Sequence, residues 1–163
     1  MSKKTIWITG GSTGIGKALA IKFAAMGWNV AISARRAELL NELSNSYENI
    51  SGFPLDVTDK EKCKEVFNEI KNKFENIDIC FFSTGTWDPK KEKEIDVEQM
   101  EDVFKVNFFG TVNCIKAVEQ YFRDKKKGII TIVSSIAGYR GLPNSTGYGL
   151  SLIHISEPTR LDD

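Results

Sequence analysis

Thr5-Ile6-Trp7-Ile8-Thr9, followed directly by Gly10-Gly11-Ser12-Thr13-Gly14-Ile15-Gly16, decides the fold of this chain. The first segment is an apolar run of the length of a buried strand, and the second is a glycine-rich turn that leads into a helical pattern. Glycine lets the backbone turn tightly and approach a pyrophosphate closely, while the N–H groups that open the following helix favour its negative charge. The stretch therefore predicts a nucleotide-binding turn.

The segments on either side of this turn support that prediction. After it, apolar residues recur at roughly helical spacing until Gly27; they are Ile15, Leu19, Ile21, Phe23 and Ala24. A second apolar strand at residues 29–33 then completes a βαβ unit. A glycine-rich turn alone can serve only to end a strand, but in this position it predicts dinucleotide binding.

The composition fits one ordinary globular domain. Of the 163 residues, 41% are apolar and 27% are charged, and nothing in the sequence suggests a membrane span. The 22 basic and 22 acidic side chains cancel, so no net field draws the chain toward nucleic acid or anionic lipid. We therefore expect neither nucleic acid nor membrane as a partner.

The cysteine and charge patterns point to the same class of protein. Cys63, Cys80 and Cys114 are odd in number and lack metal-ligand spacing, so we expect small buried side chains in a reducing compartment and no metal site. No signal-peptide pattern precedes the first strand, which predicts a cytoplasmic protein. The charged runs at residues 90–94 and at Lys125-Lys126-Lys127 are predicted to be solvated loop charges.

Strand and helix signals alternate along the rest of the chain. Helices are expected at 37–46, 59–74 and 98–123, and strands at 50–54, 78–83 and 129–133. Residues 79–82 and 129–133 do not alternate between apolar and polar, as is typical of strands buried on both faces. The predicted fold class is therefore α/β, a Rossmann-like doubly wound parallel sheet whose ligand lies at the carboxyl ends of the strands.

With these segments placed, the chain resembles the classical short-chain dehydrogenase/reductase family over residues 3–149. Four segments carry the resemblance. Two match the family's cofactor motifs: Thr9 to Gly16 reads as its TGxxxGIG turn, and Leu55-Asp56-Val57 reads as its adenine-contacting LDV. The other two match its catalytic segments: Val106-Asn107 corresponds to the segment with the asparagine, and Ser134-Ser135-Ile136-Ala137-Gly138 corresponds to the segment with the serine. Tyr148 stands 13 positions after Ser135, the family's usual separation. The resemblance implies an NAD(P)-dependent oxidoreductase with a small-molecule carbonyl or alcohol substrate, and a homo-oligomer at full length.

The resemblance also implies roles for three residues. Tyr148 would protonate the substrate carbonyl oxygen during reduction, Ser135 would hydrogen-bond that oxygen, and Asn107 would hold a water in the proton relay. A free phenol has a pKa of about 10, so such a site must stabilise the phenolate. Each residue alone has a structural alternative, as a turn cap, a backbone-bonding amide or a surface ring, but their joint order and spacing favour catalysis.

The implied cofactor site gathers residues from the ends of four strands: Gly10, Ser12, Thr13, Gly14, Ile15, Gly16, Arg35, Arg36, Asp56, Val57, Ser83, Thr84 and Gly85. The residues after the second strand indicate which dinucleotide, NAD(H) or NADP(H), the site prefers. A carboxylate there would bind the ribose 2′-hydroxyl, whereas Arg35 and Arg36 offer guanidinium groups suited to a 2′-phosphate. NADP(H) is therefore preferred over NAD(H), unless these arginines only solvate the start of the next helix.

The chain departs from the family pattern at two places. The family's Asn-Asn-Ala-Gly is here Phe82-Ser83-Thr84-Gly85, which keeps only the glycine. The lysine four residues after the tyrosine, which in the family binds the nicotinamide ribose and favours the phenolate, is here Leu152. We therefore expect the chain as written to be inactive.

The residues that follow suggest the origin of the second departure. Leu150-Ser151-Leu152-Ile153-His154-Ile155-Ser156-Glu157-Pro158-Thr159-Arg160 resembles a translation of the adapter DNA used in transposase-based sequencing libraries. We therefore expect residues 1–149 to be a dinucleotide-binding domain truncated after its fifth strand, and residues 150–163, with the only histidine, to be a non-native tail. The alternative is that the tail continues a helix from near Tyr148 until Pro158.

Two further expectations concern the strand at 129–133 and the substrate. This strand would form an unpaired sheet edge, which predicts a poorly soluble chain. Trp87-Asp88-Pro89 and Tyr139-Arg140-Gly141-Leu142-Pro143 suggest a pocket wall that mixes aromatic and polar groups. Such a wall is compatible with a sugar, a ketoacyl thioester, a steroid or a small ketone.

Two other functions compete with an oxidoreductase. A non-catalytic dinucleotide-binding sensor or scaffold of the same fold is the alternative if Leu152 is native. A sugar-nucleotide epimerase would share the fold and the tyrosine. It is disfavoured because Gly10, Gly14 and Gly16 give GxxxGxG spacing, whereas the epimerases usually have GxxGxxG.

Overall fold

A computed structural model of the protein describes residues 3–89 and 94–156, with side chains described through residue 153. The chain forms two compact units. The first comprises Met1–Thr84 with Gly110–Val133, and the second comprises Gly85–Phe109 with Ser134–Asp163. Most of the charged run predicted at residues 90–94 lies outside the described residues, as does Pro158.

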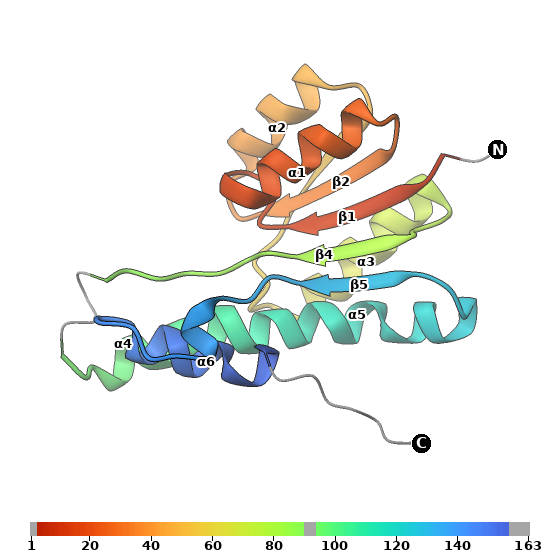
Figure 1. Cartoon of the computed structure of the whole chain (residues 1–163). Coiled ribbons are helices and arrows are strands. Elements are labelled where there is room, and N and C mark those ends of the chain that lie inside the picture. The colour runs from red at the N-terminus through yellow and green to blue at the C-terminus, as the bar shows by residue number, and fades with distance from the viewer. Residues whose placement is uncertain (1–2, 90–93, 157–163) are drawn as a thin grey trace. The chain divides into compact units, whose positions relative to one another are not determined.

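The first unit is built on a five-stranded parallel sheet in the order β3-β2-β1-β4-β5 (Figure 1). Its strands are β1 (Thr5–Thr9), β2 (Asn29–Ala34), β3 (Ile50–Pro54), β4 (Ile79–Phe82) and β5 (Ile129–Ile132). β1 lies between β2 and β4, with Ile6 opposite Val30 on one side and Ile79 on the other. The strand order changes direction here, as it does in doubly wound sheets. The predicted α/β fold class is therefore confirmed.

Helices cover both faces of this sheet. α1 (Gly14–Ala25) and α2 (Ala37–Ser46) lie on one face, and α3 (Lys60–Phe74) and α5 (Gly110–Lys125) lie on the other (Figure 1). Ile6 and Ile8 of β1 are buried in a cluster with side chains of α1 and α2. Trp7 points to the opposite face, because side chains alternate along a strand, and its ring lies 5.8 Å from that of Phe67 in α3. β1 is therefore apolar on both faces.

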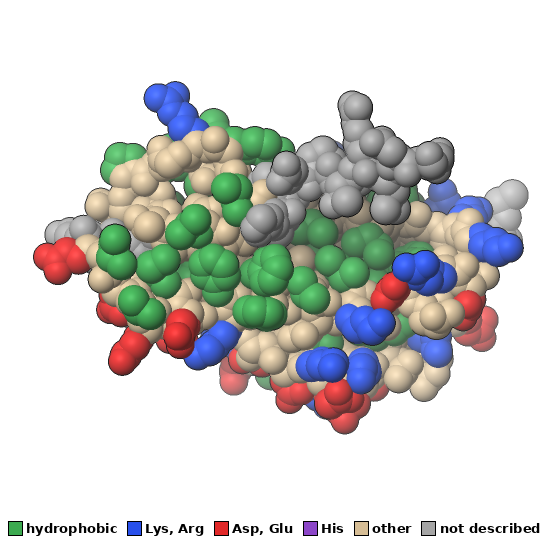
Figure 2. Space-filling view, turned by 90° about the horizontal axis from the view of Figure 1, so that it is seen from below, with side chains coloured by type: hydrophobic (Ala, Val, Ile, Leu, Met, Phe, Trp, Pro, Cys, Tyr) green, Lys and Arg blue, Asp and Glu red, His purple; other side chains and the backbone are tan. Residues whose placement is uncertain are grey.

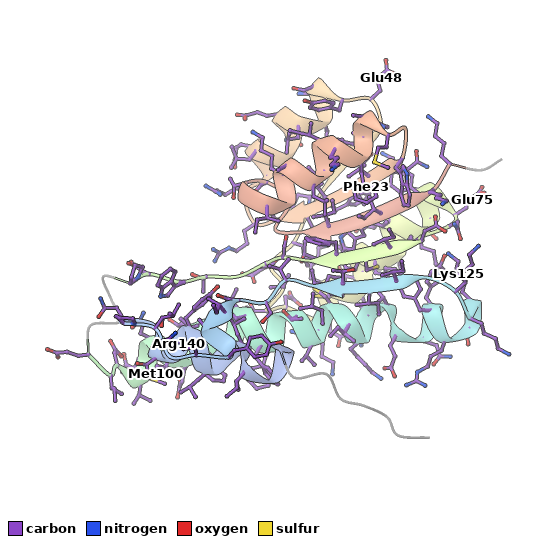
Figure 3. The ribbon with its side chains drawn as sticks, viewed as in Figure 1. Phe23, Glu48, Glu75, Met100, Lys125 and Arg140 are labelled. Atoms are coloured by element: carbon purple, nitrogen blue, oxygen red, sulfur yellow. The ribbon has the colours of Figure 1, made fainter. Side chains whose placement is uncertain are left out.

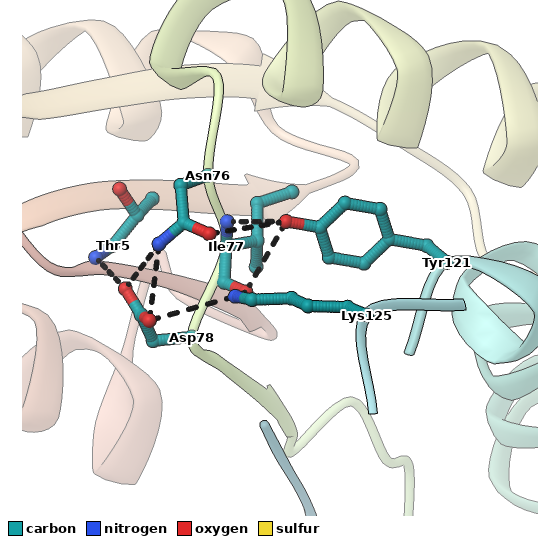
Figure 4. Close-up of polar contacts among 6 residues, drawn as sticks. All are labelled: Thr5, Asn76, Ile77, Asp78, Tyr121 and Lys125. Carbon is teal, nitrogen blue, oxygen red and sulfur yellow. Dashed lines mark hydrogen bonds and ion pairs between the residues drawn. The ribbon is translucent and has the colours of Figure 1, made fainter. Parts of the chain in front are cut away.

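A polar cluster joins the amino-terminal ends of β1 and β4 (Figure 4). The Asp78 carboxylate accepts hydrogen bonds from the Thr5 N–H at 2.9 Å and from the Asn76 amide at 3.0 Å, and the Lys125 ammonium lies 3.5 Å away. Burial acts to raise the pKa of Asp78, but these hydrogen bonds and the ammonium outweigh it and hold the pKa below its ordinary value. The prediction that Lys125 is a solvated loop charge is wrong, because the end of α5 directs it toward this carboxylate.

The three cysteines are buried, as the sequence predicts, and all lie in the first unit. Burial raises the pKa of the Cys80 thiol well above its ordinary range. Cys63 of α3 and Cys114 of α5 share a hydrogen bond, which lowers the pKa of Cys63 and raises that of Cys114. These thiols are part of the packing between the sheet, α3 and α5.

The second unit holds α4 (Val97–Phe104), a π-helical turn (Lys105–Phe109), a 3-10 turn (Ile136–Gly138) and α6 (Thr146–Ser156). The helix predicted at 98–123 is therefore interrupted by a π-helical turn before it continues as α5. α6 packs against α4 and against the 3-10 turn. The tail follows the alternative prediction as far as Ser156, because it continues the helix that contains Tyr148.

Hydrophobic side chains also reach the surface, and Figure 2 shows them gathered on the face seen from below. Within the first unit, β5 is an edge strand, and β4 is its only partner among the described strands. Ile129 of β5 is 56% exposed, and Ile130 is exposed as well. The predicted unpaired edge is therefore confirmed. Across residues 3–89 and 94–156, no helix has the length and apolar character needed to cross a bilayer.

Candidate active site

The glycine-rich turn after β1 closes tightly on itself in the first unit. Gly10 has φ +68°, and a Cβ on it would lie 2.8 Å from the Ser83 carbonyl oxygen. A Cβ on Gly16 would lie 2.3 Å from the Gly10 carbonyl oxygen, closer than any real contact allows. The Gly11 N–H donates to the Ser33 carbonyl at 3.1 Å, which ties the turn to β2. Side chains at Gly10 and Gly16 would therefore force the backbone of this turn apart.

α1 begins at the end of this turn with its backbone donors uncapped by any side chain. Thr13 precedes the helix in an extended conformation, its side chain makes no capping bond, and the first turn holds no acidic residue. Ser12 is buried, whereas Thr13 and Gly14 are exposed. The first N–H groups and the positive end of the helix dipole therefore favour an anion here, and a pyrophosphate fits these donors.

Ile15 lies in the first turn of α1, as the predicted helical pattern requires, but on the exposed side of the helix. It is 64% exposed, so it does not join the hydrophobic core, whereas Leu19, Ile21 and Phe23 pack against the core cluster. Phe23 meets Trp28 edge to face with ring centroids 4.8 Å apart (Figure 3). The first turn of α1 therefore presents an apolar side chain to solvent beside the uncapped donors.

Arg35 and Arg36 follow β2, and both are exposed. Arg36 stands immediately before α2 in an extended conformation. Neither guanidinium forms an ion pair with a carboxylate in the described part of the chain. Their charges are therefore not neutralised locally and can face a phosphate group.

The predicted residues after β3 and β4 make hydrogen bonds that hold the backbone at the ends of these strands. Asp56 accepts hydrogen bonds from the Thr58 N–H at 3.0 Å and from the Thr58 hydroxyl at 2.8 Å. The Val57 carbonyl accepts the Asn113 amide at 3.0 Å. The Ser83 hydroxyl donates to the Thr9 carbonyl at 2.7 Å, which joins the ends of β4 and β1.

The cofactor residues of the first unit share one edge of the sheet. Because parallel strands end on the same side, the segments after β1, β2, β3 and β4 lie at the carboxyl edge, with Thr84 half-buried among them. Gly85 is the one predicted cofactor residue that falls in the second unit. A Cβ on Gly85 would lie 3.5 Å from Asn107 Oδ1, so this glycine adjoins the predicted catalytic asparagine.

Asn107 is the most buried of the predicted catalytic residues, with 2% of its surface exposed, and it lies in the π-helical turn. Its amide clamps the backbone of Thr86, because Oδ1 accepts the Thr86 N–H at 2.7 Å and Nδ2 donates to the Thr86 carbonyl at 3.1 Å. Nδ2 also donates to the Ser151 hydroxyl at 3.1 Å. π-helical turns often occur at functional sites, where they re-aim a side chain. Here the turn places a buried amide between two segments of the second unit.

Tyr148 lies in α6 and is linked to this amide. The Ser151 hydroxyl donates to the Tyr148 carbonyl at 2.7 Å, so a chain of hydrogen bonds runs from Asn107 through Ser151 to the backbone of Tyr148. The phenol ring stacks on the indole of Trp87, with ring centroids 5.2 Å apart and planes inclined by 20°. The sequence predicts Trp87 only as part of a pocket wall at Trp87-Asp88-Pro89 and not as a neighbour of Tyr148. Ser151 is not among the predicted site residues.

Close packing holds the helix that carries Tyr148. A Cβ on Gly147 would lie 2.9 Å from Met100 Cγ of α4, and a Cβ on Gly149 would lie 2.9 Å from the Ala137 carbonyl oxygen (Met100 is labelled in Figure 3). The glycines on either side of Tyr148 therefore allow α6 to approach α4 and the 3-10 turn. Leu152, one turn further along α6, is 5% exposed.

Ser135 precedes the 3-10 turn that packs against α6. Its hydroxyl oxygen accepts the Ala137 N–H at 3.2 Å, so it caps this turn, as the structural alternative predicts. Since the oxygen acts as the acceptor in that bond, the hydroxyl hydrogen can still donate to a second group. Asn107, Ser135 and Tyr148 are far apart in the sequence, and the structure places all three in the second unit. The described residues contain no group of three or more His, Cys, Asp or Glu side chains arranged to hold a metal ion.

Comparisons with known proteins point to one family. A family model described as short chain dehydrogenase matches residues 4–153. The chain is 29% identical over 156 residues to dehydrogenase/reductase SDR family member 7 of Mus musculus, and the alignment covers 91% of this chain and 46% of that protein. It is 32% identical over 152 residues to the 3-oxoacyl-(acyl-carrier-protein) reductase FabG of Thermotoga maritima, and this alignment covers 91% of this chain and 62% of that protein.

A solved structure gives the same result. The structure of ElxO with NADP bound superimposes with a TM-score of 0.86 at 31% sequence identity, over 94% of this chain and 64% of that chain. The chain thus spans less than two thirds of each of these three proteins. The family model matches nearly the whole chain, and the sheet order agrees with it. This chain therefore belongs to the short-chain dehydrogenase family, whose fold is that of NAD(P)-dependent oxidoreductases.

Proposed function

We propose that the whole protein is an NADP(H)-dependent oxidoreductase that reduces a small-molecule carbonyl group or oxidises the corresponding alcohol. The observation that carries this proposal is the grouping of Asn107, Ser135 and Tyr148 in one compact unit of a chain that belongs to this family. Asn107 is buried and bonded to the backbone of Thr86, so it is built into the structure rather than exposed on a loop.

The residues of the first unit fit a dinucleotide. The uncapped N–H groups at the start of α1 suit the pyrophosphate, and the close approach of Gly16 to Gly10 leaves the turn free of side chains that would block it. The exposed guanidinium groups of Arg35 and Arg36 suit a 2′-phosphate, which supports NADP(H) over NAD(H). When bound, the nicotinamide supplies or accepts the hydride of the reaction.

The residues of the second unit would handle the proton and the substrate oxygen. Tyr148 would donate its phenolic proton to the carbonyl oxygen during reduction and take it back during oxidation. Ser135 would donate its hydroxyl hydrogen to the same oxygen, since its own oxygen already accepts the Ala137 N–H. Asn107 would hold a water of the proton relay while its amide fixes the backbone of Thr86.

We further propose that residues 150–160 are translated adapter DNA, that the natural residue at position 152 is lysine, and that the chain as written is inactive. Leu152 offers neither a charge nor a hydrogen-bond donor to stabilise a phenolate. Its burial within the second unit favours a second candidate, a dinucleotide sensor without catalysis, if leucine is native at this position. Reading the uninterrupted gene separates the two, because lysine at 152 supports the enzyme and any other residue supports the sensor.

The activity test uses the product of that uninterrupted gene. We expect it to oxidise NADPH when it is mixed with a panel of sugar, ketoacyl thioester, steroid and small ketone substrates. Tyr148→Phe is the matched control and should lower kcat by about 10²- to 10⁴-fold while it leaves the Kd for NADPH unchanged. Failure of the protein to bind either dinucleotide would refute the proposal. Consumption of NADH in preference to NADPH would refute only the role of Arg35 and Arg36.

A further inference from the structure

Trp87 is the aromatic neighbour of the proposed proton donor within the second unit. Its indole lies nearly parallel to the Tyr148 phenol, with ring centroids 5.2 Å apart and an angle of 20° between the planes. Trp87 is 45% exposed, so one part of the indole is covered and another part is open to solvent. A stacked neighbour restricts rotation of the phenol about its side-chain bonds, because a different ring orientation would lose this contact.

The indole is itself held at two places that do not involve Tyr148. Its Nε1–H donates to the Asn144 carbonyl at 3.1 Å, which fixes the plane of the ring. The backbone one residue earlier, at Thr86, is clamped from both sides by the Asn107 amide. The stack therefore rests on a supported indole rather than on a freely moving surface side chain.

Asn107 supports the Trp87 side of the stack, because its amide bonds both backbone groups of Thr86, the residue before Trp87. In the 163-residue chain the Ser151 hydroxyl also links this amide to the backbone of Tyr148, but Ser151 lies in the stretch proposed to be adapter-encoded and carries no part of the inference. A change in the position of Trp87 would remove the face on which the phenol rests.

We propose that Trp87 is the positioning residue of Tyr148. It holds the phenol in one orientation, so that the hydroxyl is already aimed when a carbonyl substrate binds. This inference rests on the proposed function, since it assigns a role relative to the same proton donor. A catalytic group that is misplaced by a small distance loses much of its rate advantage, whereas substrate and cofactor affinity change little.

The test compares Trp87→Leu with Trp87→Phe in the product of the uninterrupted gene. Leucine fills part of the volume but cannot stack, so we expect kcat to fall about tenfold while the KM for NADPH stays within twofold. Phenylalanine restores a stacked ring without the Nε1 donor, and we expect it to recover most of the lost kcat. The matched control is Trp28→Leu, which removes an aromatic pair in the first unit and should leave kcat unchanged.

Near-ultraviolet circular dichroism gives a second readout that does not need activity. In the 163-residue chain, Trp87→Leu should change the tyrosine band and Tyr148→Leu should change the tryptophan band, because each breaks the same stack. A tryptophan band left unaltered by Tyr148→Leu, or an unchanged kcat in Trp87→Leu, would overturn the positioning role and leave the proposed function standing. An unsubstituted whole protein that binds NADPH but reduces no carbonyl would overturn the proposed function and this inference with it.

Discussion

Asp78 is the residue on which the amino-terminal ends of β1 and β4 depend. It is mostly buried, it accepts bonds from Thr5 and Asn76, and it lies near the Lys125 ammonium. Its pKa is lowered in the folded protein, so its ionised form is stabilised by folding. That stability is fully present above the carboxyl's unfolded pKa of about 3.9 and is lost as the pH falls through the lower folded value.

Asp78→Asn tests this dependence. The amide cannot match the charge-assisted bonds, so we expect the free energy of unfolding to fall by about 1–3 kcal/mol at pH 7. The difference from the unsubstituted chain should shrink in strongly acidic solution, where Asp78 itself is protonated. Urea unfolding at several pH values measures both effects.

The control is Asp102→Asn, which removes one partner of an exposed ion pair with Lys105 and should change the free energy of unfolding little. Equal stability of Asp78→Asn and the parent chain at pH 7 would contradict this account.

A second prediction at the scale of single residues concerns Arg35 and Arg36. Replacing both with alanine removes the guanidinium groups proposed to bind a 2′-phosphate. We expect the Kd for NADPH to rise about 10- to 100-fold and the Kd for NADH to stay nearly constant. Titration of each nucleotide against the protein measures both constants. Lys22→Ala, at the far end of α1, controls for loss of positive charge. A parallel loss of NADH affinity would show that the arginines do not read the phosphate.

Sequence reasoning failed at single residues whose partners lie far along the chain. Lys125 belongs to a run of three lysines that resembles a solvated segment, and only the fold brings the first of them to Asp78. The stack between Trp87 and Tyr148 is equally invisible, because no local pattern links a loop residue to a helix that begins much later. The apolar spacing that places Ile15 in a helix does not show that this position of the first turn faces solvent.

At the scale of elements, the glycine-rich turn between β1 and α1 is the segment that tolerates least change. A Cβ on Gly16 would lie 2.3 Å from the Gly10 carbonyl oxygen, so even alanine must push the turn apart. We expect Gly16→Ala to lower the free energy of unfolding by about 1–3 kcal/mol and to weaken NADPH binding markedly. Gly141→Ala is the matched control, because its added Cβ meets nothing within 4 Å. Thermal unfolding and NADPH titration would measure the two effects, and unchanged binding in Gly16→Ala would argue against a phosphate site here.

Most elements could be predicted from the sequence because their signals are local. The helix at Ala37–Ser46 and the strand at Ile50–Pro54 have the predicted bounds, since polar turn residues flank clear apolar patterns. The π-helical turn at Lys105–Phe109 could not be predicted, because the apolar spacing of a helix continues through it. That turn buries Asn107, so the sequence proposes this residue for the site but does not show the geometry that positions it.

At the scale of the whole molecule, the sequence predicted the fold class but not its division. The sheet order and the match to the short-chain dehydrogenase family follow from strand and helix signals that alternate along the chain. Most of the predicted cofactor residues belong to the first unit, whereas Asn107, Ser135 and Tyr148 belong to the second. This division depends on contacts between distant segments, which one sequence does not reveal.

The last prediction concerns β5, the exposed edge strand of the sheet. Ile129 and Val133 donate their N–H groups to carbonyls of the segment around β4, so the alternate residues Ile130 and Ile132 direct their backbone groups outward. We expect the 163-residue chain to self-associate through this edge. Ile130→Lys should weaken the association, and sedimentation velocity would measure it. Met26→Lys replaces an exposed apolar side chain at the end of α1 and should leave the association unchanged. A purely monomeric parent chain at high concentration would refute the prediction.

The sequence of β5 also determines where such association would stop. On either side of Thr131 stand Ile130 and Ile132, and beyond them Ile129 and Val133, so the strand is nearly palindromic. A second copy running antiparallel about a twofold axis at Thr131 would exchange reciprocal hydrogen bonds at Ile130 and Ile132. Such an interface is isologous and uses up the edge of both copies, so it closes as a dimer and does not propagate into a fibre.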